Sequence, residues 1–300
     1  MRVGVDVGGT KILAVAVDEG GSVVATVRRA TGWGADAVVY GICAAVETVS
    51  QGRRPDAIGV GVPGQVAPRG IVRHALNLGI DSLDLAAAVE DRIGARPVVE
   101  NDVRAAAVGV SALLPEVASL AYLNLGTGVA AGIAQGGMPW RGARGAAGEI
   151  GHVSVDPAGP VCPCGQRGCI EALAGGDAVA ARWGQAATLP VAEVFEAADA
   201  GDPLALSVRA DLVRGVAAAV QLLVLTTDVE RVVLGGGVAN LGERLRRPVR
   251  TALRAAASGS VFLASLDLAD RVVPVPSDAP IGALGAALLA GAPAAAVPGM

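Results

Sequence analysis

One pattern occurs twice in the chain: an apolar strand ends in a glycine turn, and a second strand follows. The first copy covers residues 2–17 around the turn Gly8-Gly9-Thr10-Lys11, and the second covers residues 119–135 around Gly126-Thr127-Gly128. Alternating apolar and small residues are typical of strands. The repeat predicts two similar lobes with a cleft between them, and chance similarity of two glycine-rich hairpins is the alternative.

The rest of the chain alternates predicted helices and strands, which indicates an α/β fold. Apolar residues make up 52% of the sequence and charged residues 17%, and no Pro- or Ser-rich linker divides it, so we expect closely packed lobes. The predicted strands are 22–29, 57–62, one ending at 98–99, 231–234 and 271–275. The predicted helices are 35–50, 83–93, 102–112, 171–182, 191–199, 204–226, 240–257 and 279–290.

Glycine turns follow three predicted strands, at residues 8–11, 126–128 and 235–237. Backbone N–H groups approach an anion closely only where no Cβ intervenes, so such turns are candidate phosphate sites. None has the spacing of a Walker loop or of a dinucleotide fingerprint, and a tight hairpin is the alternative for any one of them. Asp6 precedes the first turn, where we expect it to orient Mg²⁺ through water. The candidate donors to phosphate oxygens are Thr10, Lys11 and Thr127.

The polar triplet Glu100-Asn101-Asp102 follows a predicted buried strand. In α/β proteins, ligands bind at the carboxyl ends of strands. Asp102 is therefore a candidate base that accepts a hydroxyl proton during phosphoryl transfer, and Asn101 is a candidate to hold neighbouring hydroxyls. Capping of the helix 102–112 is the alternative role, and it is compatible with catalysis.

A histidine and three cysteines form the strongest local signal: His152, Cys162, Cys164 and Cys169. One imidazole and three thiols are a complete tetrahedral set for structural Zn²⁺, and reduced cysteines beside an unrelated histidine are the alternative. A metal here would fix the positions of Glu149 and Glu171. The second ring nitrogen of His152 would remain available to a ligand hydroxyl.

The net charge of −4, the absence of a basic block and the 2% aromatic content argue against a nucleic-acid partner. The uncharged stretches 117–140 and 281–300 are rich in glycine or proline, so we expect no membrane span. The first residues lack the pattern of a signal peptide, which is a basic segment, an apolar run and a cleavage site of small residues. We therefore expect a cytoplasmic location. Asn77, after the Gly61-Val62-Pro63-Gly64 stretch, is a candidate sugar contact or an ordinary turn asparagine.

Seven motifs occur in order: DVGGTK at 6–11, GVPG at 61–64, END at 100–102, LGTG at 125–128, GEIGH at 148–152, CPCGQRGCIE at 162–171 and LGGGVAN at 234–240. They resemble those of the repressor–ORF–kinase (ROK) family, within the actin/hexokinase-like sugar kinases. The resemblance covers nearly the whole chain. It implies a two-lobed, ribonuclease H-like α/β fold, with ATP and sugar in the cleft between the lobes. We place a small lobe at 1–116, completed by a helix at about 279–291, and a large lobe with the zinc loop at 117–278.

The resemblance also implies roles for single residues. Asp102 is implied to be the general base and Asp6 the acid that orients Mg²⁺. Gly8 to Lys11 and Gly126 to Gly128 are implied to bind phosphate, and Gly235, Gly236 and Gly237 to lie on the adenosine side. The implied zinc ligands are His152, Cys162, Cys164 and Cys169. The implied sugar contacts are Gly64, Asn77, Asn101, Asp102, Glu149, His152 and Glu171.

The expected activity is ATP-dependent phosphorylation of a hexose, glucose to glucose 6-phosphate first, by a homo-oligomer, either a dimer or a tetramer. N-acetylmannosamine, N-acetylglucosamine, mannose, fructose and allose are further candidate acceptors. A sugar-sensing relative without turnover is a further class, but Asp6, Thr10 and Asp102 argue against it. A polyphosphate-using kinase is another alternative, although relatives of that kind lack the Cys-x-Cys knuckle. A repressor fits less well, because the hairpin that starts at residue 3 leaves no room ahead of it for a helix-turn-helix domain. The chain departs from the family pattern at Arg104, where Asn is usual, at Val110, where Glu is usual, and at Val129-Ala130, where Ile-Gly is usual.

Overall fold

The computed structural model describes residues 1–185 and 188–292, and these form two compact units. Unit 1 comprises residues 1–118, 132–147 and the chain from 276 onward, and unit 2 comprises residues 119–131 and 148–275. The predicted domain boundary at 116–117 stays a prediction. No helix in the described part of the chain is long and apolar enough to cross a membrane.

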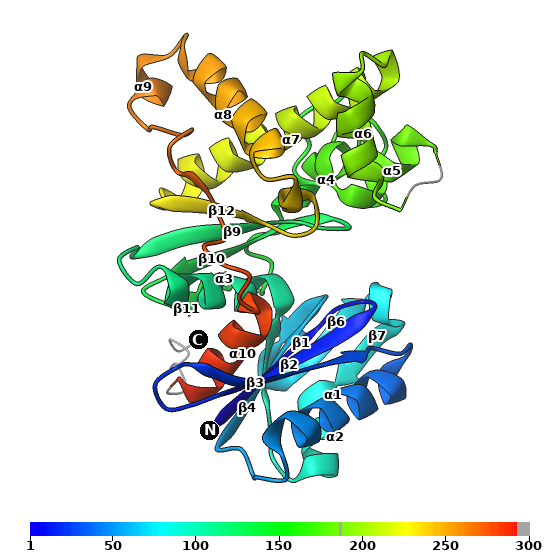
Figure 1. Cartoon of the computed structure of the whole chain (residues 1–300), viewed down its shortest axis with the longest axis vertical. Helices are drawn as coiled ribbons and strands as arrows, with labels where there is room; N and C mark the ends of the chain where they lie inside the picture. The colour runs from blue at the N-terminus through cyan, green and yellow to red at the C-terminus, as the bar shows by residue number, and fades with distance from the viewer. Residues whose placement is uncertain (186–187, 293–300) are drawn as a thin grey trace. The chain divides into compact units, whose positions relative to one another are not determined.

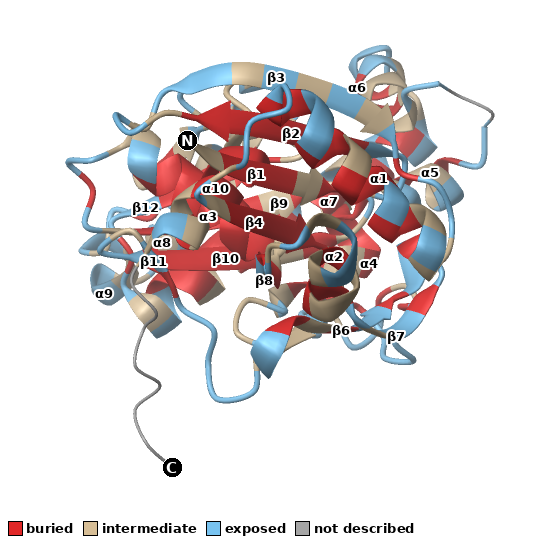
Figure 2. Ribbon diagram, turned by 90° about the horizontal axis from the view of Figure 1, so that it is seen from below, coloured by how far each residue is buried: buried red, intermediate tan, exposed pale blue. Residues whose placement is uncertain are grey.

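The first sheet lies in unit 1 and has the strand order β3-β2-β1-β4-β8. Figure 1 labels its strands β1, β2, β3 and β4. β1 pairs antiparallel with β2 and parallel with β4, and β4 pairs parallel with β8. β1, β2 and β4 are largely buried, whereas β3 and most of β8 are exposed or intermediate (Figure 2). The strands are β1 (Arg2–Val7), β2 (Lys11–Val17), β3 (Val23–Ala30), β4 (Ala57–Val62) and β8 (Val98–Asn101).

Helices cover both faces of the first sheet. α1 contacts β1, β2 and β3, while α10 contacts β1, β2 and β4 on the other side and packs against α3. The alternation of β2 explains the two faces, because Ile12 and Ala14 join the core under α1, whereas Val15 and Val17 join the core under α10. The helices are α1 (Ala35–Ser50), α2 (Leu85–Ile93), α3 (Asp102–Leu113) and α10 (Ile281–Gly291).

The second sheet repeats the first, with the order β11-β10-β9-β12-β13. β9 pairs parallel with β12, and β12 pairs parallel with β13, as β1, β4 and β8 pair in the first sheet. The repeat that the sequence indicated is therefore a repeat of strand order, and the predicted α/β fold class is confirmed. The strands are β9 (Ser119–Leu125), β10 (Val129–Gln135), β11 (Met138–Pro139), β12 (Arg231–Gly235) and β13 (Val272–Pro274).

Helices make up most of the remainder of unit 2. α7, the longest, starts where Asp202 Oδ1 accepts a hydrogen bond of 2.8 Å from Ala205 N and Pro203 occupies the first turn. It packs against α4, α6 and α8. The elements are η3 (Ile150–His152), α4 (Ile170–Ala174), α5 (Gly176–Trp183), α6 (Pro190–Asp199), α7 (Pro203–Thr227), η4 (Val238–Leu241), α8 (Glu243–Ala257) and α9 (Val261–Ala264).

Several sequence predictions differ from the structure. The predicted helix 171–182 is two helices, because Gly175 is extended and the start of α5 turns toward the glycine turn at 126–128. The strand predicted to end at Val99 continues through Asn101. The sequence predicts no strands at 65–84, yet these residues form a small antiparallel sheet of β5 (Gln65–Ala67), β6 (Ile71–Ala75) and β7 (Ile80–Asp84), with the short helices η1 (Pro68–Gly70) and η2 (Leu76–Leu78) between them.

Glycines let α10 approach its neighbours backbone to backbone. A Cβ at Gly59 of β4 would lie 1.8 Å from the Ala286 oxygen, and one at Gly4 of β1 would lie 1.9 Å from the Ala283 oxygen. On the α3 side, a Cβ at Gly109 would lie 2.0 Å from the Ile281 oxygen. No side chain fits at these points without moving the helix.

We therefore predict that Gly59→Ala lowers the free energy of unfolding by about 3 kcal/mol, because the added methyl collides with a backbone carbonyl that cannot rotate away. Gly259→Ala is the control, since a Cβ there has no atom within 4 Å. Urea unfolding measures both. Equal unfolding midpoints for the two variants would contradict the packing described here.

Candidate active site

In unit 1, the predicted site residues gather at the carboxyl ends of parallel strands. Asp6 of β1 lies opposite Gly61 of β4, and Gly61 lies opposite Glu100 of β8. The next residues of β8 and α3 are Asn101 and Asp102, and a Cβ at Gly61 would lie 3.5 Å from the Asp102 Cα. The local strand order thus brings residues that are about a hundred positions apart to one edge of the sheet.

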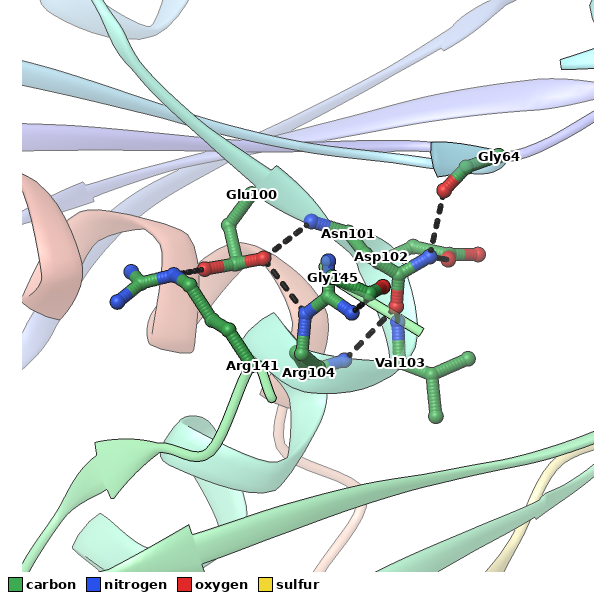
Figure 3. A network of polar contacts seen from close by, with 8 residues as sticks. All are labelled: Gly64, Glu100, Asn101, Asp102, Val103, Arg104, Arg141 and Gly145. Carbon is green, nitrogen blue, oxygen red and sulfur yellow. Dashed lines mark hydrogen bonds and ion pairs between the residues drawn. The ribbon is translucent and has the colours of Figure 1, made fainter. Parts of the chain in front are cut away.

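Asn101 uses both ends of its amide within this edge (Figure 3). Its Oδ1 accepts hydrogen bonds from Val103 N at 3.1 Å and Arg104 N at 3.2 Å, which caps α3. Its Nδ2 donates to Asp102 Oδ1 at 2.9 Å and to Gly64 O at 3.2 Å. The helix cap and the orientation of the Asp102 carboxylate therefore depend on one side chain.

Asp6 is the acid with the most perturbed protonation in this group. Burial raises its pKa to about 7, the negative charge of Asp102 also raises it, and Lys11 opposes both. A Cβ at Gly282, in the first turn of α10, would lie 2.6 Å from Asp6 Oδ2, so glycine there makes room for the carboxylate. Carboxylate oxygens are the ligand type that hard divalent cations such as Mg²⁺ prefer, so Asp6 remains a candidate to orient one.

The first glycine turn and Asn77 lie on the same side of unit 1. Gly8 N donates to Lys11 O at 2.9 Å, and Thr31 Oγ1 donates to Gly8 O at 2.6 Å, which fixes the turn. Thr10 and Lys11 are exposed. Asn77 lies in η2, and a Cβ at Gly9 would lie 3.6 Å from its Nδ2. The structure therefore brings together Asp6, Gly8, Gly9, Asn77, Gly64, Asn101 and Asp102.

In unit 2, Glu171 supports the second glycine turn. Its Oε2 accepts a hydrogen bond of 2.9 Å from Val129 N, and a Cβ at Gly128 would lie 2.3 Å from the same oxygen. On the other side of the turn, Gly176 N donates to Gly126 O at 2.8 Å and Asp177 N donates to Thr127 O at 3.1 Å. These hydrogen bonds explain the break between α4 and α5. In a continuous helix the same N–H groups would donate to carbonyl groups of the helix itself.

The third glycine turn lies against the second. A Cβ at Gly236 would lie 2.5 Å from the carbonyl carbon of Leu125. Beside the two turns there is a cavity of about 680 Å³, within the range of small-molecule sites. Its lining residues, all from unit 2, are Gly126, Thr127, Gly176, Asp177, Ala180, residues 188–192, Gly237, Val238, Asn240 and Leu241.

The histidine and the cysteines of unit 2 also come together. His152 Nδ1 lies 3.9 Å from Cys162 Sγ, and Cys164 Sγ lies 3.7 Å from Cys169 Sγ. The donor atoms of His152, Cys162 and Cys164 all lie within 4.8 Å of one another. Tetrahedral zinc with bonds of about 2.0–2.3 Å places sulfur and nitrogen ligands roughly 3.5–3.8 Å apart. His152, Cys162 and Cys164 therefore form a candidate metal group, and Cys169 lies beside Cys164.

Short hydrogen bonds organise the loop around these cysteines. Cys162 N donates to Gln166 O at 2.8 Å, and Gln166 Nε2 donates to His152 O at 3.0 Å. Hydrogen bonds from the backbone and the side chain of Gln166 lower the pKa of the Cys164 thiol to about 6. Glu149 is exposed and lies just before η3, which carries His152.

Next to Asn101, Glu100 forms ion pairs with Arg104 and Arg141 (Figure 3). The sequence did not indicate this network. Glu100 is 1% exposed and Arg104 is 2% exposed, and Arg104 Nε donates to Glu100 Oε1 at 2.8 Å. Arg141 Nε donates to Glu100 Oε2 at 2.6 Å, and an Arg104 guanidinium nitrogen donates to Gly145 O at 2.7 Å. Arg104 was visible in the sequence as a departure from the family pattern. The contact with Gly145 was not, because Gly145 lies too far along the chain for residue spacing to indicate it.

Comparison with known proteins identifies the family. The model of the ROK family matches residues 2–292. The chain belongs to the ROK family. A glucokinase of Streptomyces coelicolor is 34% identical over 272 residues, covering 83% of this chain and 86% of its own length. An N-acetylmannosamine kinase of Citrobacter koseri is 33% identical over 296 residues, which cover 95% of this chain and 97% of the relative's own length.

Solved structures agree with this membership. A ROK family glucokinase from Streptomyces griseus, in complex with glucose and AMPPNP, superimposes with a TM-score of 0.78 at 34% identity. The match covers 96% of this chain and 98% of the other. The predicted ROK fold is thereby confirmed.

The position of Asp6 predicts an unusual dependence of stability on pH in the metal-free protein. Ionisation of Asp6 costs more in the folded state, where its pKa is about 7, than in the unfolded chain, where an aspartate titrates near 3.9. The folded protein therefore binds the extra proton between about pH 4 and pH 7, and the contribution of Asp6 to stability falls as pH rises through this window.

Asp6→Asn removes that titration. We expect the variant to gain stability relative to the wild type from pH 4 to pH 7, by at most about 4 kcal/mol. Urea unfolding at pH 5 and pH 8, without Mg²⁺ or sugar, measures the difference, and Asp36→Asn, near the start of α1, controls for the loss of one carboxylate. If the free energies of unfolding of Asp6→Asn and the wild type differed by the same amount at both pH values, the predicted effect of Asp6 titration would be wrong.

Proposed function

We propose that this ROK chain is an ATP-dependent kinase that phosphorylates a hexose hydroxyl, with glucose as the first substrate and glucose 6-phosphate as the product. The observation that carries the proposal is the Asp102 carboxylate, held by Asn101 Nδ2 at the carboxyl end of β8 and beside Asp6. The relatives of this chain support glucose as the substrate, because the Streptomyces coelicolor protein is a glucokinase and the Streptomyces griseus structure contains glucose and AMPPNP.

The chemistry follows from what these groups can do. A sugar hydroxyl within hydrogen-bond reach of Asp102 gives up its proton to the carboxylate as its oxygen bonds to the γ-phosphorus. The bond from that phosphorus to the bridging oxygen of ATP breaks at the same time, and ADP leaves. The hydrogen bond from Asn101 holds one carboxylate oxygen and so fixes the orientation of the group that takes the proton.

The glycine turns supply the phosphate contacts in this proposal. The turns at 8–11 and 126–128 offer backbone N–H groups, together with Thr10, Lys11 and Thr127. Mg²⁺, when bound, neutralises negative charge on the phosphates, and Asp6 is the residue that would hold it through water. The cavity beside Gly237 is the proposed adenosine site, because it is lined mainly by apolar residues and backbone.

A second acceptor class has its own support, because the Citrobacter koseri relative is an N-acetylmannosamine kinase. The proposed sugar contacts are Gly64, Asn77, Asn101, Asp102, Glu149, His152 and Glu171, and they serve either class. Coupled assays over glucose, mannose, fructose, allose and the two N-acetylhexosamines decide between the classes. We also propose that the protein is a homo-oligomer, either a dimer or a tetramer, and that it is cytoplasmic. Light scattering measures the oligomeric state.

Asp102→Asn tests the base. The amide keeps the size of the carboxylate but accepts no proton, so we expect kcat to fall by at least about 100-fold while sugar binding is partly retained. Asp91→Asn, at an exposed position of α2, is the matched control and should keep the wild-type kcat. Near-normal turnover in Asp102→Asn would remove this residue from the role.

Removal of zinc tests the metal ligands. Four protein ligands complete a tetrahedral site, so the proposed Zn²⁺ is structural, and it orders the loop 148–171 that presents Glu149, His152 and Glu171. We expect Cys164→Ser to reduce zinc from about one ion per chain and to raise the sugar KM more than the ATP KM. Cys43→Ala, in the core of unit 1, should keep both the metal and the KM values.

Elemental analysis and steady-state kinetics on the same samples read out both effects. A purified protein that lacks zinc and has full activity would eliminate the metal site. It would leave the proposed kinase activity untouched.

A further inference from the structure

The Glu100 carboxylate is a buried charge with three donors. Oε1 accepts hydrogen bonds from Asn101 N and Arg104 Nε, both at 2.8 Å, and Oε2 accepts one from Arg141 Nε at 2.6 Å. A buried carboxylate is stable only when its oxygens are paired in this way. The last strand residue before Asn101 is therefore locked in place by two arginines.

Arg104 has a second contact that the ion pair does not require. Its guanidinium donates to the carbonyl oxygen of Gly145 at 2.7 Å. Gly145 belongs to the segment 141–147, here called the 141–147 loop, which follows β11 and closes on itself where Ala147 N donates to Arg141 O. Lysine has a single ammonium group in place of the fork of arginine, so it fits both partners less well.

We propose that Arg104 is a positioning residue for the sugar side of the active site. It holds the 141–147 loop against the junction of β8 and α3 that carries Asn101 and Asp102. This inference rests on the proposed function, because it concerns the sugar contacts of that site. It also accounts for arginine at a position where the family pattern has asparagine, since the shorter side chain would not extend as far from the backbone as the Gly145 carbonyl.

The loop leads directly to a proposed sugar contact. Glu149 follows Gly145 by four residues, a tether of about 14 Å at full extension. Release of the Gly145 carbonyl frees the start of this tether. Loss of Arg104 also removes one of the two donors to Glu100 Oε1, and the other donor is Asn101 N. The orientation of the Asn101 amide toward Gly64 and Asp102 therefore loosens as well.

Arg104→Met tests the proposal, because methionine has a similar length but no charge and no donor. We expect the sugar KM to rise at least tenfold while the ATP KM stays within twofold. Hydrogen exchange of the 141–147 peptide in the sugar-free protein should become at least tenfold faster. Arg254→Met is the matched control, since Arg254 is an exposed arginine, paired with Asp270 at 3.1 Å, and it should change neither quantity.

A double variant separates positioning from charge balance. In Arg104→Met, the buried Glu100 carboxylate keeps Arg141 but loses one of its two ion-pair partners. Adding Glu100→Gln removes that buried charge, so we expect the double variant to recover thermal stability relative to Arg104→Met alone. Because Gly145 O still lacks its donor, the raised sugar KM and the fast exchange of the 141–147 loop should persist. If the double variant restores both to wild-type values, Arg104 acts only through the charge of Glu100 and the proposal is wrong.

The exchange measurement also keeps this inference separate from the proposed function. Should the wild type phosphorylate none of the hexoses, the kinase proposal fails. Faster exchange of the 141–147 peptide in Arg104→Met would still support the anchoring role. Unchanged exchange in that variant overturns it, whatever the kinetics.

Discussion

The closeness of α10 to the first sheet is the constraint on which unit 1 depends. Gly4, Gly59 and Gly109 have no side chain, so the backbone of α10 lies directly on β1, β4 and α3. Such contacts are non-local and fill the space that side chains would occupy. They also bring the first turn of α10 to the carboxylate of Asp6, because Gly282 is the residue that faces it. The same packing that completes the core thus shapes the environment of the proposed metal-orienting acid.

Local signals in the sequence were sufficient for most elements and for the clustering of His152 with Cys162 and Cys164. The turn after β1, the strand β4 and the spacing of Cys162, Cys164 and Cys169 depend on a few adjacent residues, and each lies where the sequence indicated. The repeat of strand order is also visible in the sequence, because glycine turns mark both copies. Short-range chemistry carries these features.

What the sequence did not reveal depends on contacts between distant segments. The break at Gly175 exists because the N–H groups of α5 bond to a turn fifty residues earlier. The strands β5, β6 and β7 are short and only partly buried, so their apolar pattern is weak. Glu100 looked like one of three polar residues after a strand, and only the structure shows that it is buried and paired with Arg104 and Arg141.

The pairing of Glu100 has an asymmetric energetic consequence. A buried ion pair often adds little net stability compared with apolar residues of the same size, yet removal of one partner strands the other charge. Evolutionary change at such a place therefore requires concerted substitutions. Arg104 lies four residues after Glu100, but Arg141 lies in a separate segment, so such changes involve two stretches of the sequence.

The assignment of α10 to unit 1 has a consequence for synthesis on the ribosome. Residues 281–291 pack on residues 2–7, so the first unit to leave the exit tunnel lacks one of its covering helices until nearly all of the described chain has been made. Residues 119–275 emerge before that helix. Domains generally fold as units during translation, in the order in which they are completed. The nascent chain therefore exposes the apolar face of β1, β2 and β4 for most of its elongation, which makes this face a natural binding surface for chaperones.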